Sequence, residues 1–266
     1  MPSRRNPTRR NRNIGTAKQG HGQRNKLVIP DNHQDKIYWE NLTDYRVVTR
    51  VINLHTLHII VERTRDDACH ACTVDDITSF LWHVSPADLA EVGLILLRQP
   101  TRKQTTLKSV WGRAVFYAEI GAYTGPAVIL EAMTPDQPFR WSKSLTPDEQ
   151  RELARLREDG HSIAETCHNY IITPSLESIR ATQLYRTLPH EIGHQVDFAK
   201  TAIASDDDDG SDWDRKPSAD KEAFAHRYAD TLRNELKRQG IIPFPRQLNL
   251  ERITLAGLNI RDFQPK

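Results

Sequence analysis

The sequence lacks long apolar runs and is poor in cysteine. Its longest apolar stretch, VGLILL at 92–97, has about six residues, whereas a membrane-spanning helix needs about 20. The N-terminal region is rich in arginine but lacks the apolar core of a secretory signal. Only three cysteines occur among 266 residues, which is typical of a reducing compartment and not of a disulfide scaffold. We therefore expect a cytoplasmic protein that has no membrane partner.

Acidic residues are absent from the first 26 positions, where eight lysines and arginines occur. Too few apolar side chains are present there to offset the entropy of ordering the chain. The sequence predicts a disordered basic tail over residues 1–26 and a single domain over residues 27–266. The domain carries 29 basic and 35 acidic residues, a net charge of −6, so contact with nucleic acid or an acidic partner is expected only through the tail. The alternative for the tail is a solubilising arm that has no specific partner.

Hydrophobic periodicity and capping residues predict an α+β protein. Thr146, Pro147 and Glu149 form the start of a capped helix that ends near Gly160. Pro189 removes a backbone donor from a second helical segment, which we expect to bend or to begin there. Strands are predicted at 46–62, where a buried helix is the alternative, in a segment ending at Pro100, at 110–123 and at 127–133. Helices are predicted at 73–84, after Ser85, and at 144–161, 175–201 and 218–240. An acidic loop is predicted at 205–217. This order favours one mixed or antiparallel sheet followed by two long helices.

The segment TLPHEIGHQVDF contains two histidines, His190 and His194, with Glu191 directly after the first. Residues four apart share one face of a helix, so both imidazoles can bind one ion. Catalytic zinc sites have three protein ligands and a water molecule whose pKa the metal lowers. A glutamate beside that water can take up its proton and pass it to a leaving amine. We therefore predict that His190 and His194 bind Zn²⁺ and that Glu191 is the general base.

The third ligand must come from another part of the chain. Lys200 occupies the position at which a third histidine of an extended motif would stand. Glu222 lies on the last predicted helix, where Ala225 and Ala229 form a face of small residues that permits close helix packing. Gly193, between the two histidines, permits the same close approach from the other side. A carboxylate beside such a face favours a metal ligand, so Glu222 is predicted as the third.

The pattern HEIGHQVD…EAFAHRYA resembles that of the gluzincin metallopeptidases, and locally it is most similar to their compact lethal-factor-type catalytic domains. The motif covers residues 175–235, whereas the preceding strands agree only in their order. The resemblance implies a zincin-like fold, in which a mixed or antiparallel sheet precedes an active-site helix and a glutamate-bearing helix. It also implies that His190, His194 and Glu222 bind zinc and that Glu191 acts as the base.

Two positions depart from the patterns of these enzymes. His226 stands where thermolysin-like enzymes have an aspartate that orients a ligand histidine. Trp213 and an acidic segment lie upstream of Glu222, where lethal-factor-like enzymes have a tyrosine. Another group must then stabilise the oxyanion of the transition state. The candidates for this catalytic role are Tyr228, His226, Tyr185 and His168.

The sequence gives weaker evidence for the residues that surround the predicted metal ligands. Asp197 lies seven residues after His190 on the same helix face; it is a candidate partner for a ligand imidazole, with a plain surface aspartate as the alternative. The segments RAVFYAEIGAY and SIAETCHNYIIT are candidates for an edge strand that pairs with extended substrate. An ordinary core strand is the alternative for each.

Together these features predict a zinc-dependent metallopeptidase that hydrolyses peptide or protein substrates. The alternative is a metal-binding regulatory or interaction module of zincin-like fold, whose basic tail contacts nucleic acid or an acidic partner. Glu191 favours the enzyme, because a purely structural zinc ion needs no base beside it.

Overall fold

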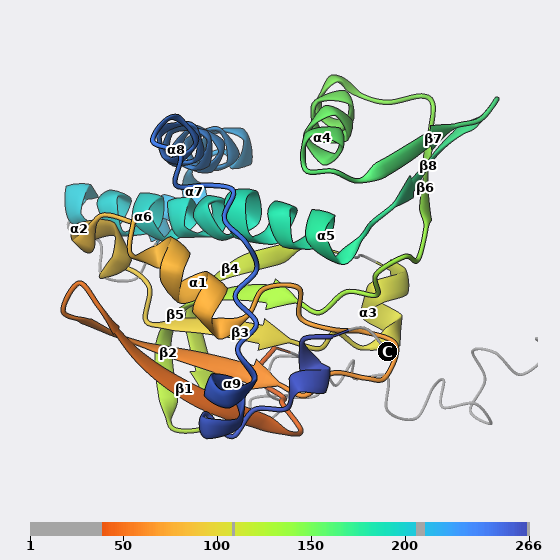
Figure 1. The fold of residues 1–266 in the computed structure, drawn as a ribbon. Coiled ribbons are helices and arrows are strands. Elements are labelled where there is room, and N and C mark those ends of the chain that lie inside the picture. The colour runs from red at the N-terminus through yellow and green to blue at the C-terminus, as the bar shows by residue number, and fades with distance from the viewer. Residues whose placement is uncertain (1–38, 108–109, 206–210, 265–266) are drawn as a thin grey trace, which may run out of the picture. The chain divides into compact units, whose positions relative to one another are not determined.

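A five-stranded mixed sheet forms the centre of the structure (Figure 1). The computed structural model describes residues 39–107, 110–205 and 211–264; the tail predicted over residues 1–26 lies outside them. The strands are β1 (Tyr45–Ile52), β2 (His55–Glu62), β3 (Leu94–Arg98), β4 (Gly112–Ile120) and β5 (Tyr123–Glu131). Their order is β1-β2-β3-β5-β4, with β2, β3 and β5 parallel and both outer strands antiparallel to their neighbours. The prediction of an α+β protein with a mixed sheet is confirmed.

The segment 46–62, which the sequence predicts to be strand for much of its length, is a hairpin of two strands, and its turn was not predicted. β1 and β2 pair antiparallel, with Ile52 opposite His55. Between them, Asn53 and Leu54 have φ values of 49° and 68°, the backbone of a two-residue turn whose twist matches that of its strands. Asparagine adopts this conformation readily but leucine does so rarely. The sequence therefore carries only half of the usual turn signal.

The helices of the described ranges agree with most of the predicted ones. Thr73 and Ser85 cap the first two helices with their side chains. None of the helices in these ranges is both long and apolar enough to cross a membrane. The acidic segment 205–217 contains a short helix rather than only a loop, and residues 206–210 lie outside the described part. The helices are α1 (Val74–Leu81), α2 (Pro86–Leu89), α3 (Arg102–Leu107), α4 (Pro147–Glu158), α5 (Leu176–Thr182), α6 (Leu188–Ser205), α7 (Ser211–Arg215), α8 (Ser218–Arg238) and α9 (Leu250–Leu255), with a 3₁₀ turn at Ile260–Asp262.

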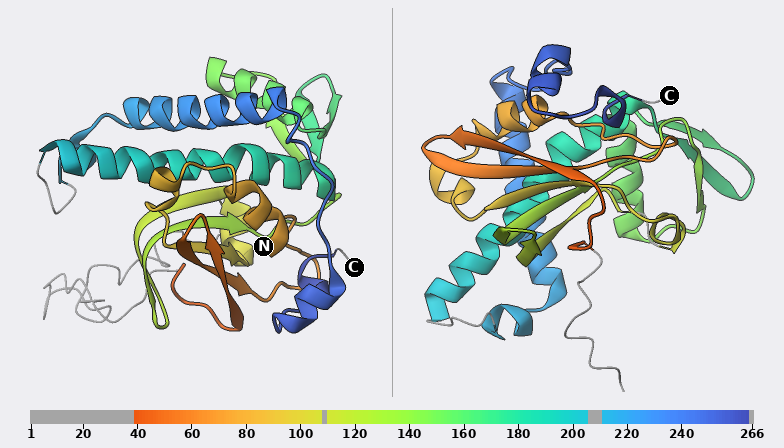
Figure 2. Two further views of the ribbon diagram at one scale, coloured as in Figure 1. Left: turned by 60° about the vertical axis from the view of Figure 1, so that its left-hand side comes forward. Right: turned by 90° about the horizontal axis from the view of Figure 1, so that it is seen from below.

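The two faces of the sheet pack against different parts of the chain. Successive side chains of a strand point to opposite faces, so Ile59 of β2 lies on the helix side and Ile60 on the other. The helix side holds the larger apolar core, which includes Ile77 of α1 and Ile192 of α6. α8 packs on α6 from the side away from the sheet (Figures 1 and 2). The opposite face is covered by partly buried side chains, Trp39, Leu42, Tyr45, Val47 and Tyr123.

A π-helical turn, Gln183–Thr187, joins α5 to α6 in one continuous helix (Figure 1). Leu188 donates its backbone N–H to the Gln183 carbonyl, the i to i−5 bond that defines this turn. In a regular α-helix Pro189 would clash with the carbonyl four residues before it, and the wider turn relieves that clash. α6 therefore begins one residue before Pro189, close to the predicted position, but the chain does not divide there.

Residues 139–173 form a small subdomain before α5. It contains α4 and a three-stranded sheet in the order β6-β8-β7, with strands β6 (Phe139–Ser142), β7 (Ser162–Glu165) and β8 (Asn169–Thr173). The predicted capping box of Thr146 and Glu149 is present at the start of α4. Leu153, Leu156 and Ile172 form a separate apolar cluster. The segment SIAETCHNYIIT forms two paired strands and not one, because the chain reverses between β7 and β8.

Two buried glutamines tie the long helix to the sheet. The Gln195 side-chain amide donates to the carbonyl oxygens of Val115 and Ala127, both at 3.0 Å. The register of β4 shifts between Val115 and Ala118, so this amide serves carbonyl groups beside an irregular part of the ladder. Gln183 binds two further carbonyls of the sheet region in the same way. These contacts fix the position of α6 along the strands.

We expect Gln195→Leu to lower the free energy of unfolding by about 2 kcal/mol, because two buried carbonyl groups lose their donor. Denaturant unfolding followed by circular dichroism measures the change. The control is Gln150→Leu on the exposed side of α4, which should change stability by less than about 0.5 kcal/mol. Equal stability of Gln195→Leu and the wild type would show that the amide makes no net contribution.

Candidate metal centre

The structure brings the three predicted ligands together between α6 and α8. The Nε2 atoms of His190 and His194 are 3.1 Å apart. Glu222 Oε2 lies 3.3 Å from His190 Nε2, and Glu222 Oε1 lies 3.6 Å from His194 Nε2. All three side chains offer a ligand atom within 4.8 Å of the others.

The spacing of these atoms fits a tetrahedral zinc ion. Zinc binds imidazole nitrogen and carboxylate oxygen at about 2.0–2.1 Å, so two ligand atoms of a regular tetrahedron lie about 3.3 Å apart. The two imidazole nitrogens, 3.1 Å apart, and the 3.3 Å contact of Glu222 Oε2 with His190 Nε2 are close to this value, whereas the 3.6 Å contact with His194 Nε2 is made by the other carboxylate oxygen, Oε1. Three protein ligands leave the fourth position of the tetrahedron open, as in catalytic sites.

Gly193 sets the distance between the two helices of the site. A Cβ atom at this position would lie 3.0 Å from Ala225 Cα, 3.2 Å from Tyr228 Cβ and 3.3 Å from the Ala225 carbonyl oxygen. Ala225 and Ala229 are buried in this contact. The prediction that small residues permit close approach is confirmed, and this approach brings Glu222 to the histidines.

Two of the ligands have protonation states that suit metal binding. Burial, and then the neighbouring His190, lower the pKa of His194 to about 4, so its imidazole is neutral near pH 7. A hydrogen bond with His190 is the main cause that lowers the pKa of Glu222, which keeps this side chain a carboxylate. Metal ligands must be deprotonated, and both groups meet that requirement without a pH change.

Glu191 lies beside the cluster and is almost fully buried. Burial raises the pKa of its carboxyl to about 7, while His190 and the Ala114 backbone amide of β4 act in the opposite direction. A carboxyl group with a pKa near the working pH can both accept and donate a proton. A bound cation would lower this pKa, because it stabilises the carboxylate.

Asp197 has partners other than the ligand histidines. Its carboxylate accepts hydrogen bonds from Lys216 Nζ at 2.6 and 2.7 Å and from Trp213 Nε1 at 3.3 Å. The Nδ1 atoms of His190 and His194 are buried and have no hydrogen-bond partner among the described residues. The predicted contact of Asp197 with a ligand imidazole is therefore not formed, because the Asp197 carboxylate is bound by Lys216 and Trp213 instead.

The candidates for the oxyanion role differ in their positions. The Tyr228 hydroxyl donates to Asp88 Oδ2 at 3.1 Å, on the α2 side of α8. The Tyr185 hydroxyl is bound to Phe244 and Arg180, and His168 is exposed in the turn between β7 and β8. These contacts direct both tyrosine hydroxyls away from the cluster. The exception is His226, whose ring centroid lies 4.5 Å from that of His190.

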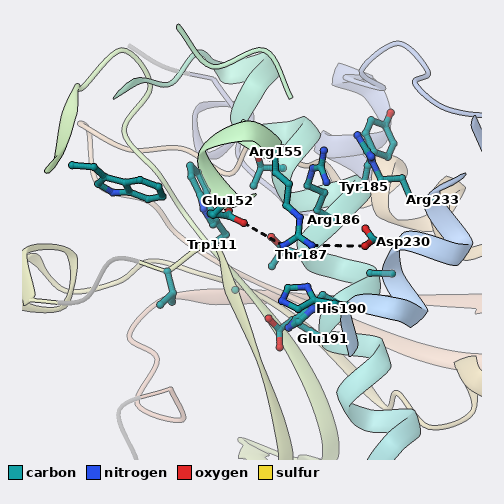
Figure 3. Close-up of a pocket in the computed structure, with 16 residues that line it drawn as sticks. Trp111, Glu152, Arg155, Tyr185, Arg186, Thr187, His190, Glu191, Asp230 and Arg233 are labelled. Carbon is teal, nitrogen blue, oxygen red and sulfur yellow. Dashed lines mark ion pairs between the residues drawn. The ribbon is translucent and has the colours of Figure 1, made fainter. Parts of the chain in front are cut away.

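A cavity of about 350 Å³ opens beside His190 and Glu191 (Figure 3). Its walls come from α6, α8, α4 and the start of β4, so the subdomain 139–173 faces the metal centre across it. Of the residues predicted from the sequence, His190, Glu191, His226 and Tyr185 line this cavity, whereas its other charged and aromatic walls were not predicted. These further lining residues include Trp111, Trp141, Glu152, Arg155, Arg186, Asp230 and Arg233.

Ion pairs fasten the subdomain to the helices of the site. Arg186 of the π turn contacts Asp159 at 2.7 Å and Glu158 at 2.6 Å. Arg233 of α8 contacts Glu158 at 3.0 Å. Hydrogen bonds from Lys237, Arg233 and Arg186 hold the pKa of Glu158 at about 2, against the effect of burial. The end of α4 is thus joined to α8 by charge, while the apolar cluster of the subdomain also packs against Trp111 outside it.

Comparison with known proteins gave no match to a family model, to a curated protein or to a solved structure. What the site can do must therefore be argued from its own geometry and chemistry.

We expect Gly193→Val to lower the free energy of unfolding by about 1–3 kcal/mol, because the new side chain overpacks the contact with Ala225. It should also weaken zinc binding, because α8 carries Glu222 away from the histidines. Thermal unfolding and zinc titration measure the two effects. Ala204→Val, at an exposed position of α6, controls for the helix propensity of valine. If both variants behave alike, the close approach is not a constraint on the site.

Proposed function

We propose that this chain is a zinc-dependent metallopeptidase of zincin-like fold. The observation that supports this most strongly is the cluster of His190, His194 and Glu222, whose ligand atoms lie within 4.8 Å of one another, with the buried Glu191 carboxyl beside it. A mixed sheet, an active-site helix α6 and a glutamate-bearing helix α8 occur in the order that the sequence resemblance implies.

The side chains around the centre have separate roles in the proposed peptide hydrolysis. Zinc bound by His190, His194 and Glu222 supplies a Lewis acid that polarises a carbonyl group and acidifies water. Glu191 takes the proton from the attacking water while the new C–O bond forms. Glu191 then gives that proton to the amine as the C–N bond breaks. The burial of Glu191 raises its affinity for the proton that it carries between these steps.

The sheet offers a place for an extended substrate. β4 is an outer strand of the sheet, and its Ala114 amide interacts with the Glu191 carboxyl. Backbone groups on the outer side of β4 therefore lie next to the general base. A peptide added as a further strand along this edge would bring a carbonyl group to the metal centre. This agrees with the first of the two predicted edge segments, RAVFYAEIGAY.

The alternative function is a metal-binding regulatory or interaction module. It requires the same three ligands but no base, so the two functions differ in the role of Glu191. Zinc content together with peptide cleavage separates them.

We expect Glu191→Gln to retain one zinc ion per chain but to lose peptide cleavage by a factor of about 10²–10⁴, the usual contribution of a general base. His190→Ala, His194→Ala and Glu222→Ala should lose the metal, and activity with it. Elemental analysis and cleavage of a degenerate peptide library measure both properties. His168→Ala serves as the control, because His168 is exposed and outside the cluster.

A zinc-loaded wild type that cuts no peptide in the library would favour the binding module. Full cleavage by Glu191→Gln would exclude Glu191 as the base. Unchanged zinc content in all three ligand variants would rule out the site itself.

Removal of zinc should destabilise the fold, because the ligands bind the ion only when α6 and α8 are together. At a free zinc concentration 100-fold above Kd the gain is about 2.7 kcal/mol. Thermal unfolding with zinc and with a chelator measures the difference in Tm. His194→Ala should show no such difference, and a zinc-dependent Tm in that variant would locate the metal elsewhere.

A further inference from the structure

Three guanidinium groups line the cavity beside the metal centre, and one of them differs from the others. Arg186 and Arg233 are mostly buried and hold Glu158 or Asp159 at 2.6–3.0 Å. Arg155 has two carboxylate neighbours, but each is farther away. Its Nη1 lies 3.6 Å from Glu152 Oε2, and its Nη2 lies 3.7 Å from Asp230 Oδ2.

These two distances are too long for charge-assisted hydrogen bonds, which form at about 2.7–2.9 Å. Among the described residues no hydrogen bond engages the Arg155 guanidinium, although it has five N–H donors. Glu152 and Asp230 are partly exposed, with side-chain exposures of 35% and 48%, so water competes for them. Arg155 thus keeps unused donors inside the cavity.

Arg155 lies between the subdomain and the metal centre. Figure 3 shows its guanidinium between Glu152 and Asp230, on the side of the cavity that faces His190. Arg155, His190 and His226 line the same cavity, and the ring centroids of His226 and His190 are 4.5 Å apart. A substrate held at the metal would therefore place a neighbouring group close to Arg155.

The cavity has the walls that such a group needs. Trp111 and Trp141 line the same space, and indole rings cover the methylene groups of a side chain while excluding water. Excluding water strengthens a charge-assisted hydrogen bond. A carboxylate can accept two parallel N–H groups from one guanidinium at short distance, which the present neighbours of Arg155 do not.

We propose that Arg155 is a specificity-determining residue that binds a carboxylate of the substrate next to the bond that is cut. The carboxylate belongs either to an aspartate or glutamate side chain or to the C-terminus of a peptide. This proposal rests on the proposed peptidase function for its position in the reaction, but the binding of a carboxylate in the cavity is tested without cleavage.

A cationic side chain is the competing occupant, because the carboxylates of Glu152 and Asp230 also make no hydrogen bond among the described residues. It would have to displace Arg155 from between them and then lie against the displaced guanidinium. The carboxylate needs no such displacement. The structure therefore favours an acidic group, and peptides that carry lysine at the same position test the alternative.

The first experiment measures kcat/KM for peptides that contain glutamate, glutamine or lysine at the position next to the cleaved bond, each with a free or an amidated C-terminus. The wild type should prefer glutamate to glutamine by about 10- to 100-fold, the value of one charge-assisted pair. Arg155→Met should remove this preference, so that the glutamate and glutamine peptides have similar kcat/KM values. If the preference instead follows the free C-terminus, the carboxylate is the terminal one.

The matched control is Arg151→Met. Arg151 lies one turn before Arg155 on α4, is 65% exposed and pairs with Asp148, and it does not line the cavity. This variant should keep the wild-type preference. Equal losses in both variants, or a wild-type preference for lysine, would overturn the proposal.

The second experiment measures binding alone, by calorimetry of the same peptides with the zinc-loaded Glu191→Gln protein. The glutamate or free-acid peptide should bind about tenfold more tightly or better than its neutral partner, and Arg155→Met in this background should abolish the difference. If the wild type cuts none of the peptides but this difference in affinity is present, the peptidase function fails and the carboxylate site stands. If peptides are cut without any Arg155-dependent preference in rate or affinity, the carboxylate site fails and the peptidase function stands.

Discussion

The contact of α6 with α8 at Gly193 is the constraint on which the site depends. His190 and His194 lie on either side of Gly193, and Glu222 lies one helical turn before Ala225, the residue that Gly193 touches. A Cβ atom at Gly193 would lie 3.0–3.3 Å from atoms of Ala225 and Tyr228 on α8, so a larger residue there would push this helix and Glu222 away from the histidines. The absence of one Cβ atom thus turns two separate helices into one set of ligands. Small residues therefore lie next to the candidate ligands on both helices because the two helices must approach closely there.

The position of α6 is fixed in turn by polar contacts that an apolar helix face alone does not provide. The hydrophobic effect has no direction, whereas the Gln195 amide must meet two particular carbonyl groups of β4 and β5. A fully bonded polar group in the interior selects one arrangement, because any other leaves buried groups without partners. The π turn before Pro189 acts together with this contact. It lets the helix continue through the proline, so that His190 and Glu191 follow it at a fixed height beside β4.

Local spacing explains what the sequence could predict here, and long-range pairing explains what it could not. The capping residues Thr146 and Glu149, the histidine spacing and the small face around Ala225 act within a few residues. The capping box, the proximity of the two histidines and the close contact at Ala225 are all present in the structure. Asp197 was misjudged because its partners, Lys216 and Trp213, approach from a segment after α6. The turn at Asn53 and Leu54 was missed because leucine is a rare residue for its backbone. The strand order of the sheet depends on pairings far apart in the chain, which no local pattern contains.

The candidate metal centre belongs to α6 and α8, which also line the cavity beside it, whereas a further wall of this cavity comes from the subdomain. The ligands belong to α6 and α8, which pack on the main sheet, whereas Arg155 belongs to a subdomain with its own apolar cluster. Glu158 and Asp159, at the end of α4, pair with Arg186 of the π turn and with Arg233 of α8. The Asp159 side chain is nearly buried, at 3% exposure. A buried pair is screened little by salt and loses much when one partner is removed. Arg155 and the candidate ligands lie on separate elements, α4 in the first case and α6 and α8 in the second. Under the proposed function, metal binding would depend on the packing of α6 against α8, and substrate selection would depend on the charge that α4 presents to the cavity.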